Sequence, residues 1–136
     1  MSKLVSSLQK AVVKSRRKAI SRYVFDEFKG EVRYGPFKGL FLSGNANTSK
    51  GNLGAKVCGL YEQTLLNWLS NNGPYKDVVN FGAADGYFSI GLLISGTAER
   101  SICFESTEMG RKAIEDNARM NGVSDSVIIR GVVDEN

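Results

Sequence analysis

The feature that most constrains this chain is the alternation of apolar runs and glycines between residues 78 and 105. Val78-Val79-Asn80-Phe81 predicts a short apolar strand, and Gly82-Ala83-Ala84-Asp85-Gly86 predicts a tight loop. Tyr87–Leu93 then predicts the start of a helix, and Ser101–Phe104 predicts a second apolar strand ending at Glu105. Strands that are almost continuously apolar are typical of parallel sheets covered on both faces.

The pattern continues toward the C-terminus. A helix is predicted from about Thr107 to Asn121, followed by Gly122, and Val127–Ile129 predicts a third strand. We expect Met109, Ala113, Ile114 and Met120 to face inward on that helix. The order strand-loop-helix-strand-helix-strand predicts a three-layer, Rossmann-like α/β fold with a parallel sheet.

The residues that precede this pattern predict a helical and hairpin extension. Tyr34–Gly39 is a turn signal followed by apolar Leu40–Leu42, which indicates short strands or a hairpin, and a loose loop is expected from Ser43 to Asn52. One long helix is predicted after it, ending at Asn71-Asn72-Gly73-Pro74. Its apolar stripe consists of Leu53, Val57, Leu60, Tyr61, Leu65, Trp68 and Leu69.

The positive charge of the chain is confined to its N-terminal segment. Up to Phe25 there are seven basic residues and no acid, whereas the remainder carries 11 basic and 14 acidic residues. Residues 2–24 predict a basic amphipathic helix that packs on the body, with Leu4, Val5, Leu8, Val12 and Val13 at roughly helical spacing. Contact with anionic lipid or nucleic acid, or an organelle-targeting role, remains open for residues 1–24. The apolar run is too short for a membrane span.

Three regions follow from these patterns. Residues 1–33 form the basic N-terminal helix region, residues 34–73 the hairpin and helix before the sheet, and residues 74–136 the sheet-forming part. The chain has no histidine, which excludes Ser-His-Asp and Cys-His nucleophile systems and histidine-based metal sites. Cys58 and Cys103 lack metal-ligand spacing, so we expect no metal site and a reducing, cytoplasmic setting.

The glycine loop and Glu105 together predict a nucleoside site. Glycines allow the backbone to approach a ligand closely, and an acid that ends the second strand can accept hydrogen bonds from both ribose hydroxyls. A dinucleotide fingerprint needs further glycines where Ala84 and Tyr87 stand, and Asp85 would repel a pyrophosphate. S-adenosylmethionine is therefore favoured over NAD. The glycines could also mark a simple strand-to-helix turn, and Glu105 could be an ordinary solvated acid.

Several segments resemble the class I S-adenosylmethionine-dependent methyltransferases, and more closely their FkbM-like branch. Residues 78–89 resemble the first motif of that family, and Cys103-Phe104-Glu105-Ser106 resembles the second, whose acid binds ribose. Residues 117–123, 35–39 and 59–62 are also similar to segments of the branch. The resemblance covers about residues 34–134 and implies methyl transfer to an oxygen of a small molecule or sugar.

The resemblance implies specific contacts with the cofactor. Gly82, Ala83 and Gly86 would line its methionine part, Glu105 would bind the ribose, and Tyr87 or Phe88 would pack under the loop. Asn80 departs from the acid that is usual at its position. No catalytic residue can be named. The implied cofactor-binding set is Asn80, Phe81, Gly82, Ala83, Ala84, Asp85, Gly86, Tyr87, Glu105, Ser106 and Thr107.

The resemblance also implies that the fold is incomplete. By this resemblance, the complete class I domain would have a seven-stranded sheet, whereas this sequence predicts only its first three core strands. The strand at 78–81 should be central, so its free edge needs a cover: a missing C-terminal half, a second copy of the chain or the N-terminal segment. The alternative function is a non-catalytic Rossmann-like module that binds nucleic acid or a protein partner through the basic arm. An NAD-dependent fold is a third alternative.

Overall fold

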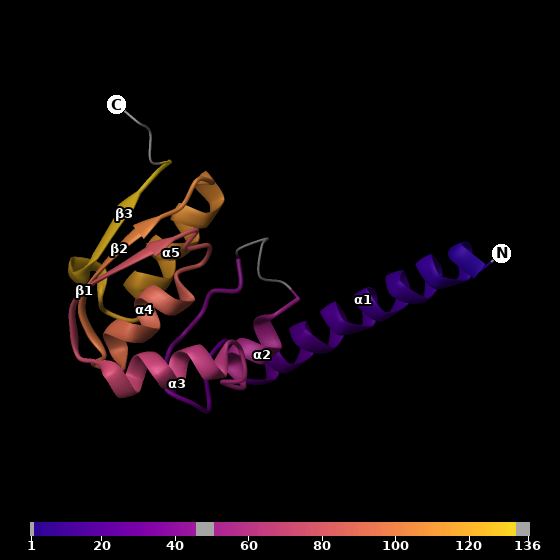
Figure 1. The fold of residues 1–136 in the computed structure, drawn as a ribbon, viewed down its shortest axis with the longest axis horizontal. Helices are drawn as coiled ribbons and strands as arrows, with labels where there is room; N and C mark the ends of the chain where they lie inside the picture. Colours follow the sequence, from indigo (N-terminus) through magenta and orange to yellow (C-terminus); the bar gives the residue numbers. More distant parts are fainter. Residues whose placement is uncertain (1, 46–50, 133–136) are drawn as a thin grey trace.

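The computed structural model describes residues 2–45 and 51–132, with side chains from Gln9 onward. Figure 1 shows a small α/β body from which one long helix extends. The elements, in chain order, are α1 (Ser2–Glu27), α2 (Leu53–Val57), α3 (Gln63–Asn72), β1 (Tyr75–Phe81), α4 (Tyr87–Ile94), β2 (Ala98–Phe104), α5 (Glu108–Met120), the short 3-10 helix η2 (Ser124–Ser126) and β3 (Val127–Arg130).

The three strands form one parallel sheet in the order β1-β2-β3. Val79 of β1 is in register with Ile102 of β2, which is in register with Ile128 of β3. Helix α4 connects β1 to β2, and α5 with η2 connects β2 to β3. The predicted Rossmann-like α/β architecture is confirmed. Strands β1 and β2 each begin three residues earlier than the apolar pattern predicted.

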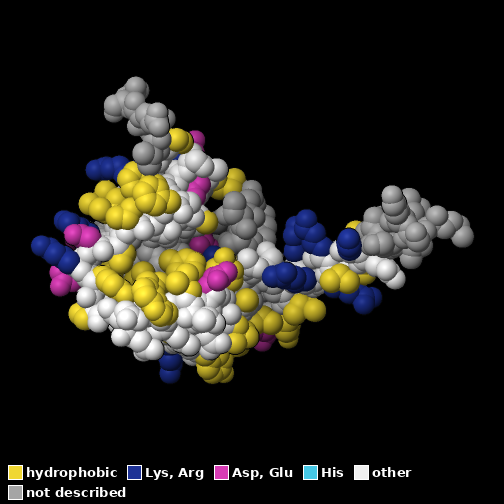
Figure 2. Space-filling view, viewed as in Figure 1, with side chains coloured by type: hydrophobic (Ala, Val, Ile, Leu, Met, Phe, Trp, Pro, Cys, Tyr) yellow, Lys and Arg dark blue, Asp and Glu magenta, His cyan; other side chains and the backbone are white. Residues whose placement is uncertain are grey.

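The helices, together with the segment that precedes β1, cover one face of the sheet. The prediction that both faces are covered is wrong for the described residues. Toward the covered face, the core contains Tyr87, Ile90, Cys103 and Ile114, all at most 2 % exposed. On β1, by contrast, Val79 is 52 % and Phe81 69 % exposed. Hydrophobic side chains gather over the part of the surface where the sheet lies (Figure 2). Strand β1 is an edge strand here, because β2 is the one described strand that pairs with it.

The segment before the sheet forms a narrow hairpin. Glu31 and Phe41 make one antiparallel bridge, and Val32 N–H donates to the Leu40 carbonyl at 2.8 Å. The expected hairpin is therefore present, without full strands. Much of the loose loop predicted from Ser43 to Asn52 lies outside the described residues.

The prediction of one helix from Leu53 to the stop at Asn71-Asn72-Gly73-Pro74 is wrong, because the chain turns between α2 and α3. Gly59 and Glu62 have left-handed φ values of 68° and 50°. A side chain at Gly59 would collide with the carbonyl oxygen of Tyr34, so this close approach requires glycine. The break also changes the buried stripe: Leu66 is fully buried, whereas Trp68 is 59 % exposed. Leu60 and Leu65 are also exposed.

Among the described residues, hydrogen bonds join the C-terminal part of helix α1, from Arg17 onward, to the body. Residues 9–20 are all exposed, and the helix extends away from the sheet (Figure 1). Ser21 and Phe25 are buried, and the Ser21 hydroxyl accepts a hydrogen bond from Gly54 N–H at 2.8 Å. The expectation of a helix packed along its apolar stripe is thus wrong at Val12 and Val13, while the side chains of Leu4, Val5 and Leu8 lie outside the described residues. In the part of the chain described, no helix is long and apolar enough to span a membrane.

Helix α5 buries a stripe that differs in part from the predicted one. Ala113 and Ile114 are buried as expected, whereas Met109 and Met120 are each about half exposed. The buried positions Gly110, Ala113, Ile114, Asn117 and Ala118 repeat at steps of three and four residues, as one helix face requires. The two methionines lie off this face, and a buried asparagine takes a place that hydrophobicity alone does not predict.

Candidate functional site

The 82–86 loop lies at the carboxyl ends of β1 and β2. The Gly82 and Ala83 N–H groups both donate to the Phe104 carbonyl, at 2.8 and 3.1 Å, which turns the loop over the end of β2. Gly82, Ala84 and Gly86 have left-handed φ values of 72°, 54° and 78°. For an L-residue such as Ala84 this conformation costs about 1–2 kcal/mol. Surrounding contacts must therefore hold the loop in this shape.

Glu105 is the side chain toward which the loop and the start of α5 converge. Its Oε2 atom accepts the Ala84 N–H at 2.9 Å, and Oε1 accepts the Thr107 N–H and hydroxyl at 2.9 and 2.7 Å. Burial by itself raises the pKa of this carboxyl, but the hydrogen bonds from Thr107 and Ala84, together with the charge of Arg111, hold the pKa below its usual value. Glu105 is thus a carboxylate at neutral pH, and Oε2 retains one acceptor position for a ligand hydroxyl.

The segment after Glu105 is fixed by helix capping. The Thr107 hydroxyl accepts the Gly110 N–H at 3.1 Å as the N-cap of α5. Arg111 Nη1 donates to the carbonyls of Glu105 and Ser106 at 2.9 and 2.8 Å. Gly110 allows the close approach, because a Cβ there would lie 2.5 Å from Glu105 Cγ. Ser106 and Thr107 remain exposed beside the carboxylate.

Asp85 does not place a free charge in the loop, which corrects the argument against a pyrophosphate. Its side chain is 5 % exposed and pairs with Lys56 Nζ of α2, at 2.8 Å from Oδ1 and 2.6 Å from Oδ2. Burial lowers the pKa of Lys56, while the nearby charge of Asp85 opposes that shift. Lys56 was missed in the sequence. The available signal was one lysine within the otherwise uncharged segment Leu53–Val57.

Aromatic rings surround the Lys56 ammonium and close the space below the loop. The Nζ atom lies 5.1 Å from the centre of the Tyr87 ring and 5.4 Å from that of Tyr61. Tyr87 is 2 % exposed and makes an edge contact with Phe37 at 5.3 Å between ring centres. Burial raises the pKa of the Tyr87 hydroxyl far above its usual value. Tyr87 is thus part of the core beneath the loop and does not line an open surface.

The implied site residues therefore separate into groups. Phe81, Gly82, Ser106 and Thr107 are exposed at the strand ends, whereas Ala83, Asp85, Gly86, Tyr87 and Glu105 are buried and Ala84 is intermediate. Asn80 faces α4, where its amide donates to the Ser89 hydroxyl at 3.0 Å. Among the described residues, the His, Cys, Asp and Glu side chains form no group of three that could hold a metal ion.

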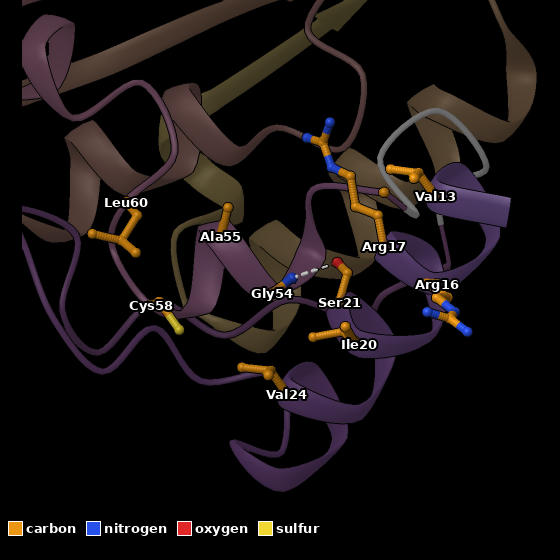
Figure 3. Close-up of a pocket in the computed structure, with 11 residues that line it drawn as sticks. Val13, Arg16, Arg17, Ile20, Ser21, Val24, Gly54, Ala55, Cys58 and Leu60 are labelled. Carbon is orange, nitrogen blue, oxygen red and sulfur yellow. Dashed lines mark hydrogen bonds between the residues drawn. The ribbon is translucent and has the colours of Figure 1, made fainter. Parts of the chain in front are cut away.

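Grooves of the described surface also lie away from Glu105 and the glycine loop. One, of about 400 Å³, follows the free edge of β1 and is lined by Asn80, Ser89 and apolar side chains of α3, β1 and α4. Another, of about 500 Å³, lies between α1 and α2 (Figure 3). Its walls include Ile20, Val24 and Leu60, and Arg17 beside it donates to the Asn52 side chain at 2.8 Å. Neither groove was predicted from the sequence, because each depends on how separate elements pack in the folded chain.

Comparison with known proteins gives similarity to solved structures over part of the chain. No protein-family model and no curated protein matches it. TrmK of M. capricolum, solved in complex with the natural cofactor product S-adenosyl-homocysteine, aligns over 49 % of this chain and 30 % of its own, with 10 % identity and a TM-score of 0.46. A protein of the NADB-Rossmann superfamily from Streptococcus agalactiae aligns over 48 % of this chain and 30 % of its own, with 18 % identity and a TM-score of 0.43.

The protein PH0793 of Pyrococcus horikoshii aligns over 60 % of this chain, with 21 % identity and a TM-score of 0.44. The aligned region spans only 27 % of that solved chain. This chain thus covers less than a third of the length of each of the three structures. Because the TM-scores of these three structures lie below 0.5, the Rossmann-like assignment rests on the sheet order and parallel pairing of the chain itself.

Proposed function

We propose that the chain is the cofactor-binding part of an S-adenosylmethionine-dependent methyltransferase. The observation that supports this most directly is Glu105: a charged carboxylate at the end of β2, hydrogen-bonded to the 82–86 loop, with an acceptor position free on Oε2. That position suits a ribose hydroxyl. Ser106 and Thr107 lie exposed beside it for the adenosine end.

The loop fits the other end of such a cofactor. Gly82 is exposed, and a Cβ built on it would meet no atom within 4 Å, so its backbone is open to a ligand. S-adenosylmethionine, when bound, supplies an electrophilic methyl group. The residues of this chain would bind and orient it, and binding energy used for positioning lowers the barrier of an in-line displacement.

The finer assignment is an FkbM-like enzyme that transfers methyl to an oxygen of a small molecule or sugar. Its support is the resemblance of residues 78–89 and 103–106 to the two family motifs. We also propose a cytoplasmic setting, since Cys58 and Cys103 are both free thiols. The free edge of β1 would be covered by a second copy or by a C-terminal half of the domain.

Titration with S-adenosylhomocysteine, with NADH run in parallel, tests the cofactor. We expect calorimetric binding of S-adenosylhomocysteine and a roughly 10- to 100-fold weaker affinity in Glu105→Gln, which is the usual contribution of a hydrogen bond to a charged group. Glu108→Gln is the matched control, because Glu108 is an exposed acid three residues away. Absent binding, or equal affinities of wild type and Glu105→Gln, would contradict the proposal. Preferential binding of NADH would support the NAD alternative, since the buried Lys56–Asp85 pair removes the charge argument against it.

One observation favours a second function, a non-catalytic module that binds nucleic acid or a protein partner. Residues 9–20 of α1 are all exposed and include Lys10, Lys14, Arg16, Arg17 and Lys18. A basic helix of this kind neutralises phosphates and releases counterions, so binding should fall steeply with salt. Lys10→Gln/Lys14→Gln/Lys18→Gln should weaken RNA or DNA binding and flatten its salt dependence. Unchanged binding in the triple variant would exclude the arm as the nucleic-acid contact.

A further inference from the structure

Lys56 and Asp85 form an ion pair unlike the others described in this chain. Their side chains are 4 % and 5 % exposed, whereas in every other described ion pair both side chains are at least 26 % exposed. The pair joins α2, which precedes the sheet, to the 82–86 loop, which follows β1. Two parts of the chain nearly thirty residues apart are thus tied together inside the protein.

Asp85 is held from three sides. Lys56 Nζ contacts both carboxylate oxygens, and Oδ1 also accepts the N–H of Tyr87, the first residue of α4, at 3.2 Å. The main-chain carbonyl of Asp85 accepts the Asn117 amide of α5 at 2.8 Å. The orientation of this one residue therefore depends on α2, α4 and α5 together.

The residue before Asp85 makes the contact that matters for the proposed site. Ala84 has a left-handed φ of 54°, and in that conformation its N–H donates to Glu105 Oε2. We propose that Lys56 is a positioning residue for the 82–86 loop: through Asp85, it holds the loop in the shape that directs the Ala84 N–H at the Glu105 carboxylate. What the site binds still rests on the proposed function, whereas the positioning itself does not.

Stability alone is a poor explanation for such a pair. Removing two charges from water is costly, and replacing a buried ion pair with apolar side chains is often neutral or stabilising. Lys56 also lies against the rings of Tyr61 and Tyr87, where leucine or methionine would pack well. A defined geometry for Asp85, in contrast, requires a partner that contacts both of its oxygens.

The decisive variant removes both charges, so that neither is left buried alone. In Lys56→Met/Asp85→Leu, we expect the pKa of Glu105, followed by NMR titration of its carboxyl, to rise toward its ordinary value because the Ala84 hydrogen bond is lost. As a control, Asp77→Asn/Arg100→Gln removes an exposed ion pair near the amino ends of β1 and β2, away from the 82–86 loop. This variant should leave the pKa of Glu105 unchanged.

Ligand affinity provides the second measurement. S-adenosylhomocysteine should bind about tenfold more weakly to Lys56→Met/Asp85→Leu and equally well to the Asp77/Arg100 control. A folded double variant with the wild-type Glu105 pKa overturns the positioning role. If wild type binds no S-adenosylhomocysteine but the pKa of Glu105 still rises, the proposed function fails and the positioning role stands. Should the leucine variant not fold, Lys56→Met/Asp85→Asn removes the same ion pair and keeps an acceptor for the Tyr87 N–H, and an unaltered Glu105 pKa in it also overturns the role.

Discussion

At the scale of single residues, Glu105 depends on neighbours that supply N–H groups. Three hydrogen bonds from Ala84 and Thr107 stabilise its carboxylate, and Gly110 leaves room for its side chain. The sequence indicated the acid and its place at a strand end. The resulting charge state follows from donors that only the folded chain brings together, and it can be measured.

We expect Glu105 to contribute to the loss of folding stability at acidic pH. Because its folded pKa lies below its usual value, its stabilising contribution is present above about pH 4.5 and is lost as the pH falls through the folded pKa. Glu105→Gln should lower the free energy of unfolding at pH 7 by about 1–2 kcal/mol and flatten its fall below pH 5, as measured by urea unfolding. Glu108→Gln is the control, since Glu108 is an exposed acid of the same type three residues away. If the free energy of unfolding falls equally below pH 5 in wild type and Glu105→Gln, this expectation is refuted.

Two glycines of the loop should respond differently to alanine. Both Gly82 and Gly86 have left-handed φ values, so either substitution strains the backbone by about 1–2 kcal/mol. At Gly86, a Cβ would also lie 2.9 Å from Ile90 Cδ1 and 3.3 Å from Ile114 Cγ2. Thermal unfolding should therefore show a greater loss of stability in Gly86→Ala than in Gly82→Ala, by about 1 kcal/mol or more. Equal losses of stability would mean that the side chains of Ile90 and Ile114 can move to accommodate the added methyl group.

At the scale of elements, hydrophobic periodicity located strands and helices better than it located their buried faces. The three strands and α5 were recognised, yet the one helix predicted from Leu53 to the stop at Asn71-Asn72 is two helices, with Leu66 buried and Trp68 exposed. The cause is the close approach of Gly59 to the Tyr34 carbonyl, a contact between distant residues. Helix faces are set in the same way by what packs on them.

Gly91 in α4 shows this dependence most sharply. A Cβ at this position would run into the ring of Phe37, which is 1 % exposed. In a helix interior, alanine is more favourable than glycine by about 1 kcal/mol. Overpacking a filled core should outweigh this gain, so we expect the substitution to destabilise the protein by about 1–3 kcal/mol. Gly91→Ala/Phe37→Leu should recover part of the loss, a non-additivity that chemical unfolding of the four proteins in the cycle would reveal. Strict additivity would show that the two positions do not contact each other.

At the scale of the whole molecule, the described sheet has one open face, and β1 and β3 are its edge strands. Val79 and Phe81 are exposed on β1, and Phe81 stacks on Phe104 with 4.9 Å between ring centres. Among the described elements, β2 is the one strand that pairs with β1. Edge strands with apolar side chains favour pairing with another chain.

We therefore expect the purified chain to self-associate through β1 at concentrations of tens of micromolar, as measured by sedimentation velocity. Val79→Lys should shift it toward monomer, because a charged side chain on an edge strand disfavours pairing, while stability changes by less than about 1 kcal/mol. Val13→Lys is the matched control, since Val13 is similarly exposed but belongs to α1. Equal dissociation in both variants would assign the association to something other than this edge.

The sequence by itself determined the order of the sheet elements, the parallel architecture, the glycine loop and the acid that ends β2. These features are local: apolar periodicity, turn residues and strand ends depend on neighbours along the chain. Only the tertiary structure decided that Asp85 is neutralised by Lys56, that Tyr87 lies in the core and that α1 extends from the body. Burial, charge pairing and exposure depend on which distant residues meet, and the spacing of residues in one chain does not contain that information.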